Sequence, residues 1–153
     1  MNSLHPRIRL VWIGQAVVSA AFFALVAGVV DFFTVEVGLP LAGGVFLAFF
    51  VLFAFHSLLR YRVWRYEIRG DELYLERGVF TRVKTVVPFV RIQHVDSRRS
   101  PLERLTGLAS TVVYTAGSRG ADVTVPGLTP TGADDLQARL KRLATEAEGD
   151  DAV

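Results

Sequence analysis

The side chains that could support chemistry are few, and their spacing fits no known catalytic or ligand-binding pattern. The three histidines stand far apart, at His5, His56 and His94, and His94 lies in a strand-like segment where a structural or surface role is expected. No nucleophile–base motif, paired carboxylates, metal-ligand spacing or glycine-rich phosphate loop occurs. The chain has no cysteine for a disulfide or a thiolate metal site. The sequence therefore predicts a protein that is not an enzyme and needs no cofactor or metal.

The densest group of charged side chains is a set of arginines within the segment RIQHVDSRRSPLERLTGL, at Arg91, Arg98, Arg99 and Arg104. A nucleic-acid site would need exposed aromatic side chains interleaved with the arginines, but only Phe89 is close, and Asp96 and Glu103 partly neutralise the charge. We expect some of these arginines to bond to backbone carbonyls or carboxylates around the segment. Contact with a protein partner is the alternative.

Two long apolar runs require a place away from water. The chain has 153 residues, of which 51% are hydrophobic, and no charged residue occurs between Leu10 and Val30 or between Leu39 and Leu59. At ~1.5 Å rise per residue, each run is about as long as a hydrocarbon core is thick. A signal peptide has a shorter apolar core and a small-residue cleavage site, which DFF after Val30 does not supply. A buried soluble hairpin fits this length less well, so we expect two transmembrane helices.

The positions of arginine predict the orientation of the helices. Arginines flank the two runs at Arg7 and Arg9, then at Arg60, Arg62 and Arg65, whereas the connecting Asp31–Gly38 contains no Lys or Arg. Because basic residues concentrate on the cytoplasmic side, both termini should be cytoplasmic. The group after the second helix could set topology only, or it could attract anionic lipid headgroups. Consistent with either role, Arg60 to Arg104 contains eleven basic and six acidic residues.

The apolar runs also indicate how the two helices pack. Small side chains recur every four residues in the first run, at Ala16, Ala20, Ala24 and Gly28, and the second run supplies bulky residues at Phe46, Phe49, Phe50 and Phe53. Such a stripe allows close approach of a neighbouring helix. We expect the two helices to pack on each other, with a dimer interface as the alternative. Gln15 and His56 would lie near the same end, where they could hydrogen-bond.

Beyond Arg62 the hydrophobic period changes from helical to two, which is typical of strands. We expect a hairpin with a tight turn at Arg69–Glu72, in which Gly70 is free to take a positive φ. Six strands are expected in all, over residues 64–69, 73–77, 82–87, 90–97, 110–116 and 122–125. The alternation slips at Gln93–His94, where we expect a bulge or an edge. Gly117 and Gly120 should mark the last turn.

Two helices are predicted between and after these strands. Ser100 and Glu103 have the spacing of a capping box with a proline between them, and Gly107 stands where such a short helix would end. Near the C-terminus, Thr131 could cap a helix with Asp134 at its third position. That helix carries one apolar face, made of Ala133, Leu136, Leu140, Leu143, Ala144 and Ala147, which needs a sheet to cover.

These residues resemble a known family. The segment Arg91–Leu108, the preceding VVPF, the later YTAG and the residues Leu4–Arg7 are similar to those of the YdbS-like membrane proteins with a bacterial pleckstrin-homology (PH) domain. The resemblance covers nearly the whole chain, including two helices followed by the domain. It implies a small, bent antiparallel sheet or partial barrel closed by the C-terminal helix, without catalytic residues. It also implies a larger relative, with several copies of the domain, as a partner.

The sequence departs from the broader PH pattern at two places. We expect about six strands where the full fold has seven, so the last part of the sheet should be short or irregular. Phosphoinositide-binding members use a basic loop between the first two strands, whereas the turn at Arg69–Glu72 is tight and partly acidic. Phosphoinositide binding is therefore not carried over.

The expected fold is an α+β membrane protein. Residues 1–62 would form an N-terminal segment and a transmembrane hairpin with helices at about 10–30 and 39–59. Residues 63–148 would form a cytoplasmic PH-like domain, and 149–153 an acidic tail.

The expected function is non-enzymatic. We expect a membrane-tethered module that mediates protein–protein interaction or assembly through a sheet edge or the basic cluster. The alternative is a sensor that binds anionic lipid headgroups through Arg60, Arg62 and Arg65. The expected partners are the bilayer, the larger relative and a second copy of the chain, but not nucleic acid.

Overall fold

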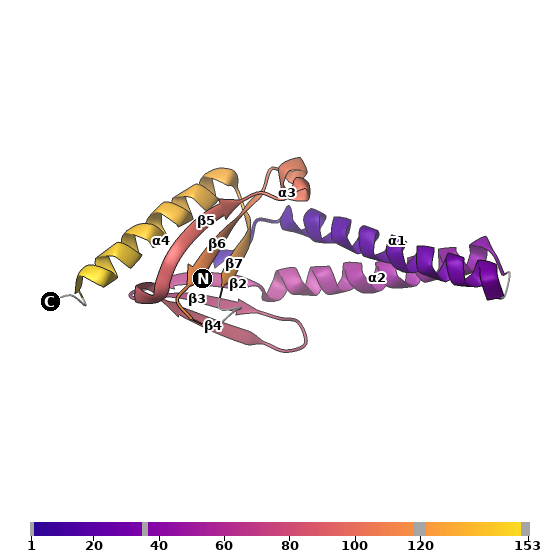
Figure 1. Ribbon diagram of the computed structural model, residues 1–153, viewed down its shortest axis with the longest axis horizontal. Coiled ribbons are helices and arrows are strands. Elements are labelled where there is room, and N and C mark those ends of the chain that lie inside the picture. The colour runs from indigo at the N-terminus through magenta and orange to yellow at the C-terminus, as the bar shows by residue number, and fades with distance from the viewer. Residues whose placement is uncertain (1, 35–36, 118–121, 151–153) are drawn as a thin grey trace. The chain divides into compact units, whose positions relative to one another are not determined.

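The computed structural model describes residues 2–34, 37–117 and 122–150 (Figure 1). The chain divides into two compact units. One, the hairpin unit, is Arg9–Arg62, and the other, the sheet unit, combines Met1–Ile8 with Val63–Val153. The boundary after Arg62 agrees with the expected one, but the residues before Arg9 group with the sheet unit and not with the hairpin. Each unit therefore has its own packing.

The hairpin unit consists of two long helices, α1 (Ile8–Thr34) and α2 (Leu39–Val63), which lie side by side in Figure 1. Both extend beyond the expected 10–30 and 39–59, because a helix keeps its backbone hydrogen bonds when it leaves the apolar region. At ~1.5 Å per residue, the 27 residues of α1 span about 40 Å, enough to cross a membrane. Each helix is long and apolar enough to be a membrane span.

The predicted stripe of small residues faces the second helix. Ala16 and Ala20 are buried, and a Cβ atom at Gly28 would lie 3.7 Å from the Cβ of Ala42. Phe23 stacks on Phe49 with 4.4 Å between ring centroids. The expectation that these helices pack on each other is confirmed.

A polar contact that the sequence did not indicate joins the two helices. The Ser57 hydroxyl lies 2.8 Å from the Phe53 carbonyl of its own helix and 3.5 Å from the Trp12 carbonyl of α1. Gln15 is exposed and His56 is half-buried, and their predicted hydrogen bond stays a prediction.

The sheet unit contains two antiparallel sheets instead of one continuous sheet. The first has four strands in the order β1 (Asn2–Ser3), β2 (Arg65–Arg69), β3 (Glu72–Arg77) and β4 (Val83–Pro88). The expectation of six strands was wrong, because Asn2 pairs with Tyr66 and Ser3 with Arg65 to add a seventh. A strand of two residues shows no alternation that sequence analysis could recognise. Its partner residues come after both helices of the hairpin in the sequence.

The N-terminal arm is also held by the second sheet. The His5 N–H donates to the Gly127 carbonyl at 2.8 Å, and Leu4 and Ile8 are fully buried. Gly127 has a φ of 66°, and a Cβ atom there would lie 3.0 Å from Ile8 and 3.2 Å from Leu4. Glycine is thus required both by backbone conformation and by the close approach of the arm.

The turn between β2 and β3 is at the expected place, but Gly70 does not adopt a positive φ. Glycine permits that conformation without requiring it. The positive φ occurs instead at Gly78, directly after β3, where φ is 102°.

The second sheet has the order β5 (Ile92–Arg98), β6 (Ala109–Thr115) and β7 (Val123–Leu128), and a 3-10 turn, η1 (Phe89–Arg91), precedes it. The register shifts between Ile92 and His94, which confirms the predicted bulge. β7 continues to Leu128, past the expected end at Val125. The predicted turn at Gly117–Gly120 falls partly on residues 118–121, outside the described residues.

The short helix α3 (Pro101–Thr106) connects β5 to β6 and carries the predicted capping box. The Ser100 hydroxyl accepts from the Glu103 N–H, and the Glu103 carboxylate accepts from the Ser100 N–H. Gly107 ends the helix with a φ of 68°, as expected.

The last helix, α4 (Pro130–Asp150), begins one residue after its cap, which is Thr129 and not the expected Thr131. The Thr129 hydroxyl accepts from the Gly132 N–H at 3.1 Å, and its carbonyl accepts from the Ala133 N–H. Pro130 suits the first helical position because it has no N–H to satisfy there. The helix includes Gly149 and Asp150, so the expected acidic tail starts inside it.

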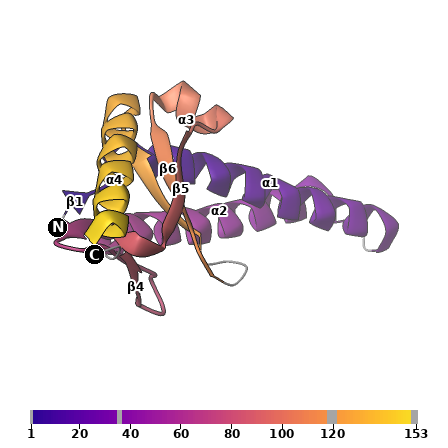
Figure 2. The same ribbon diagram turned by 60° about the vertical axis from the view of Figure 1, so that its left-hand side comes forward.

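The apolar face of α4 covers the second sheet, as Figure 2 shows. Ala133, Leu136, Leu140 and Ala144 are buried, and the fully buried Leu108, Val113 and Val125 belong to the same core. This packing places α4 beside the edge strand β5.

Candidate functional site

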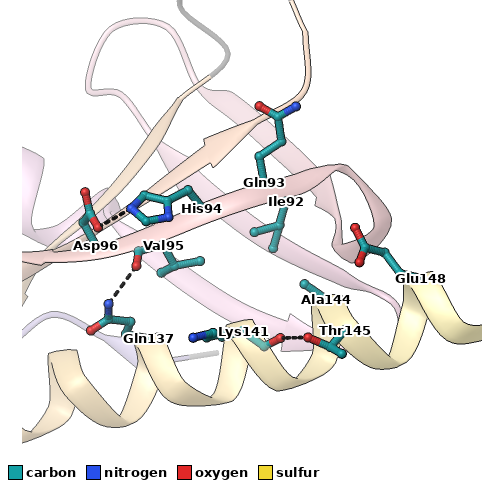
Figure 3. Close-up of a pocket in the computed structure, with 10 residues that line it drawn as sticks. All are labelled: Ile92, Gln93, His94, Val95, Asp96, Gln137, Lys141, Ala144, Thr145 and Glu148. Atoms are coloured by element: carbon teal, nitrogen blue, oxygen red, sulfur yellow. Dashed lines mark hydrogen bonds and ion pairs between the residues drawn. The ribbon is translucent and has the colours of Figure 1, made fainter.

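The candidate site is a groove between β5 and α4 in the sheet unit. Its cavity volume is about 260 Å³. Figure 3 shows the lining residues, which come from one stretch of β5 (Ile92, Gln93, His94, Val95 and Asp96) and one face of α4 (Gln137, Lys141, Ala144, Thr145 and Glu148). β5 stands at the end of its sheet, so one side of its backbone is unpaired by any strand among the described residues. The groove therefore borders a sheet edge.

A side chain occupies the place of a strand partner at this edge. The Gln137 Nε2 atom donates to the Val95 carbonyl at 2.7 Å (Figure 3). That carbonyl must point away from β6 and toward the helix. Because the N–H and C=O of one strand residue point to the same side, the Val95 N–H faces the groove too. The exposed edge thus offers the Val95 N–H as a donor and the Val95 carbonyl, which already accepts one hydrogen bond from Gln137, as an acceptor.

A polar network lies along the exposed face of β5 and β6. The His94 Nε2 atom is 2.7 Å from the Asp96 Oδ1 atom, and the His94 ring lies 5.8 Å from the Tyr114 ring. The Tyr114 hydroxyl accepts from Arg98 Nη2 at 3.4 Å. His94 is thus a surface residue with a carboxylate partner, in agreement with the role expected from the sequence.

The groove lining combines one hydroxyl side chain with apolar and charged ones. Its one hydroxyl side chain, Thr145, donates to the Lys141 carbonyl one turn earlier, so it is not directed at His94 (Figure 3). Among the described residues, no group of three or more potential ligands is placed to hold a metal ion. The lining combines apolar Ile92, Val95 and Ala144 with the opposite charges of Lys141 and Glu148.

The four arginines named for partner contact lie in η1, at the end of β5, directly after it and in α3. Arg91 precedes β5 and Arg98 ends it, and the seven residues of β5 span about 20 Å at ~3.3 Å per residue. Arg99 donates to the Leu108 carbonyl at 3.2 Å, a structural bond of the kind expected. Arg91 and Arg104 are exposed, with no side-chain bond among the described residues. Contact of these arginines with a partner stays a prediction.

The juxtamembrane arginines also have different environments. The Arg60 guanidinium lies over the Trp12 ring, 4.3 Å from its centroid, and Arg9 lies 4.9 Å from the centroid of Tyr61. Arg62, in the last turn of α2, and Arg65, at the start of β2, are exposed. Arg62 and Arg65 are therefore the members of the predicted lipid-binding group that water reaches best.

Sequence reasoning missed the helix side of the groove. Gln137 follows the buried Leu136, and a polar residue next to an apolar stripe is also typical of a solvated position. Its bond joins residues 42 positions apart, which no local spacing reveals.

Comparisons with known proteins agree with the fold. A family model described as bacterial PH domain matches residues 10–144. The UPF0699 transmembrane protein YdbS of Bacillus subtilis (strain 168) is 35% identical over 92 residues, which make up 60% of this chain and 56% of that protein. The similarity thus spans little more than half of the relative's length. No solved structure gives a significant match.

Proposed function

The chain belongs to the bacterial PH domain family and is a membrane protein with two candidate spans, and from this premise we propose that it is a non-enzymatic, membrane-tethered interaction module. In this proposal the hairpin unit anchors the chain. The sheet unit binds an extended segment of a partner protein at the cytoplasmic surface of the membrane.

The observation that carries this proposal is the unpaired edge of β5 beside α4. An exposed strand edge is a template for another strand, and a neighbouring helix supplies side-chain contacts that select the sequence added. The Gln137 amide on the Val95 carbonyl takes the place that a partner N–H would occupy. An incoming strand would replace that bond and gain the Val95 N–H as a second contact.

The side chains of the groove suggest what the segment carries. Ile92, Val95 and Ala144 offer an apolar floor for alternate side chains of an extended peptide. Lys141 and Glu148 lie seven residues apart on α4, about 10 Å at ~1.5 Å per residue. A segment with an acidic and a basic residue at that separation would complement both.

The arrangement of the N-terminal arm supports the proposed tether. Asn2 and Ser3 pair with Tyr66 and Arg65, which supports a hairpin that enters and leaves the membrane on one side. The arginines at both ends of the hairpin, and their absence from 31–38, favour the cytoplasm for that side. Tethering then raises the effective concentration of the groove toward other membrane proteins.

The proposed partners are proteins of the same membrane. The first is a larger relative with several PH-like domains, as the family resemblance implies, and the second is another copy of this chain. Either would present an extended segment at the same height above the bilayer.

Site-specific photo-crosslinking in native membranes tests the proposal. A photoreactive residue at Lys141, inside the groove, should give one defined protein adduct, attached through an extended segment of the partner. The matched control is Glu146, which is exposed on α4 and does not line the groove. Equal adduct patterns at the two positions, or only lipid adducts at Lys141, would contradict the proposal.

A backbone variant separates strand addition from side-chain contact. The Ser97 N–H should face the same edge as that of Val95, two residues earlier, so Ser97→Pro removes an edge donor without removing a bond to β6. Loss of one neutral backbone hydrogen bond should lower the adduct yield by roughly threefold to tenfold. An unchanged yield would show that the partner does not pair with β5.

A further inference from the structure

The helix α3 exposes an apolar side chain without a structural reason. Leu105 has 84% of its surface exposed, whereas Leu108, just past the helix, is fully buried. The adjacent Arg104 is exposed too. The one acidic residue of α3, Glu103, points inward, where it bonds to Ser100 and Ser110. The outer surface of α3 is therefore apolar and basic.

This surface lies beside Arg7, which precedes the first candidate span. The Arg7 Nη1 atom is 3.8 Å from the position that a Cβ atom of Gly107 would occupy, so Arg7 borders the C-terminal end of α3. Arg7 directly precedes Ile8, the first residue of the candidate span α1. Arg7 and Gly107 both belong to the sheet unit, so their proximity does not depend on how the hairpin is oriented.

The arm between Arg7 and the sheets is fixed. The His5 N–H donates to the Gly127 carbonyl, the Ile8 N–H donates to the His5 carbonyl at 3.0 Å, and Ile8 packs against Gly127. The start of α1 is thus held at a constant distance from α3. Ile8, the first residue of the candidate span, therefore belongs to the same unit as α3.

We propose that α3 rests on the bilayer surface, with Leu105 inserted at the boundary of headgroups and acyl chains and with Arg7 and Arg104 bound to the phosphates of anionic lipids. An exposed leucine flanked by arginines has the chemistry of an interfacial anchor. The lipid contact sets the tilt of the sheet unit, and so the direction in which the groove faces. This inference concerns a different surface from the groove and does not rest on the proposed function.

The chain has no cysteine, so single labels can measure the depth of this contact. Leu105→Cys is labelled with an apolar fluorophore in the full-length protein, in nanodiscs that contain phosphatidylglycerol. Quenching by a water-soluble agent should be roughly threefold weaker than for the same label at Glu146→Cys, and a quencher in the acyl chains should act on position 105 alone. Equal access of the water-soluble quencher to both labels would overturn the proposal.

Substitutions test the two kinds of contact without altering the core. Leu105→Ser and Arg104→Glu should each abolish the protection of residues 101–108 from hydrogen exchange that nanodiscs provide. Leu105→Ile and Arg104→Lys should retain it. Because both residues are exposed, thermal unfolding in detergent should be the same for all four variants. Protection that persists in Leu105→Ser would refute insertion of this side chain.

The headgroup contact should depend on lipid charge. Replacing phosphatidylglycerol by phosphatidylcholine should weaken the contact by up to about thirtyfold, as expected for losing two arginine contacts of ~1 kcal/mol each near an anionic surface. Salt at about 1 M, where the Debye length is ~3 Å, should weaken protection in the same way. Identical protection in neutral nanodiscs would show that Arg7 and Arg104 do not bind anionic lipids.

Discussion

Two buried carboxylates, one in each unit, stabilise the start of a helix by different means. Glu103 in the sheet unit is 6% exposed and accepts from the Ser100 N–H at 2.7 Å and from the Ser110 hydroxyl. Asp31 in the hairpin unit is 3% exposed and accepts from the N–H groups of Val37 at 2.9 Å and Gly38 at 2.7 Å. Both satisfy donors just before a helix begins.

The difference between them lies in what each carboxylate connects. Glu103 belongs to the helix that it caps and also reaches Ser110 on β6, so it joins α3 to the sheet. Asp31 lies near the end of α1 and caps the start of α2, so its hydrogen bonds to Val37 and Gly38 join only the two ends of the connection between the helices. A carboxylate that links two elements of a core should matter more than one that closes a single turn.

The largest effect should come from Glu103→Ala. The substitution removes the cap bond and leaves the buried Ser110 hydroxyl without its acceptor, so the free energy of unfolding of the sheet unit should fall by about 2 to 4 kcal/mol. Denaturation of the full chain in detergent measures this through Trp64, with Trp12 replaced by Phe. Glu103→Gln retains an acceptor oxygen and should lose less. A loss below about 1 kcal/mol would mean that Ser110 finds another partner.

Asp31→Ala should have the second largest effect. It leaves the N–H groups of Val37 and Gly38 without the carboxylate, but both lie next to a helix end where water can replace it. The hairpin unit should therefore lose about 1 to 2 kcal/mol. Denaturation followed through Trp12, with Trp64 replaced by Phe, measures the loss. If Asp31→Ala costs more than Glu103→Ala, the ranking of the two carboxylates is wrong.

The same contrast explains what the sequence could predict. The capping box at Ser100 and Glu103, the end of α3 at Gly107 and the bulge at Gln93–His94 were all predicted, because each depends on residues at most a few positions apart. Asp31 was read only as part of a loop. Its partners lie six and seven residues away, and only the folded connection brings them to its carboxylate.

The features that the sequence did not predict depend on tertiary contacts. β1 pairs with a strand beyond the whole hairpin, and the groove exists only because α4 crosses β5. At α4, Thr131 was the cap expected from the sequence, but Thr129 caps the helix, and Pro130 suits the first helical position. The arginines were grouped by sequence distance, but the strand β5 separates Arg91 from Arg98.

Ser100→Ala removes only the hydrogen bond from the Glu103 N–H to the Ser100 hydroxyl, and so separates the helix cap from the link to β6. The Glu103 N–H loses its side-chain acceptor, whereas the bond from Ser110 to the carboxylate remains. The sheet unit should lose about 1 kcal/mol, the usual cost of an N-cap replaced by alanine. Ser100→Asp, a good cap, should restore most of the stability. If Ser100→Ala matches Glu103→Ala in the same denaturation experiment, the link to β6 contributes nothing.

Glu67 completes the comparison as a carboxylate at the surface, and Glu67→Gln should have the smallest effect. The Arg69 Nε atom donates to Glu67 Oε2 at 3.1 Å, and this hydrogen bond lowers the pKa of Glu67 below its ordinary value. Because the pKa is lower in the folded state, the contribution of Glu67 to stability is present above the unfolded pKa of about 4.3 and is lost as the pH falls through the folded pKa.

Solvent screens the ion pair between Glu67 and Arg69, so at pH 7 the unfolding midpoints of Glu67→Gln and the unchanged protein should nearly coincide. Any small difference at pH 7 should shrink as the pH falls below about 4, whereas the deficit of Ser100→Ala should persist. An unfolding midpoint of Glu67→Gln that differs from that of the unchanged protein by the same amount at neutral and acidic pH would mean that the charge of Glu67 is not the cause. The contrast between this surface carboxylate and the buried Glu103 and Asp31 would then fail.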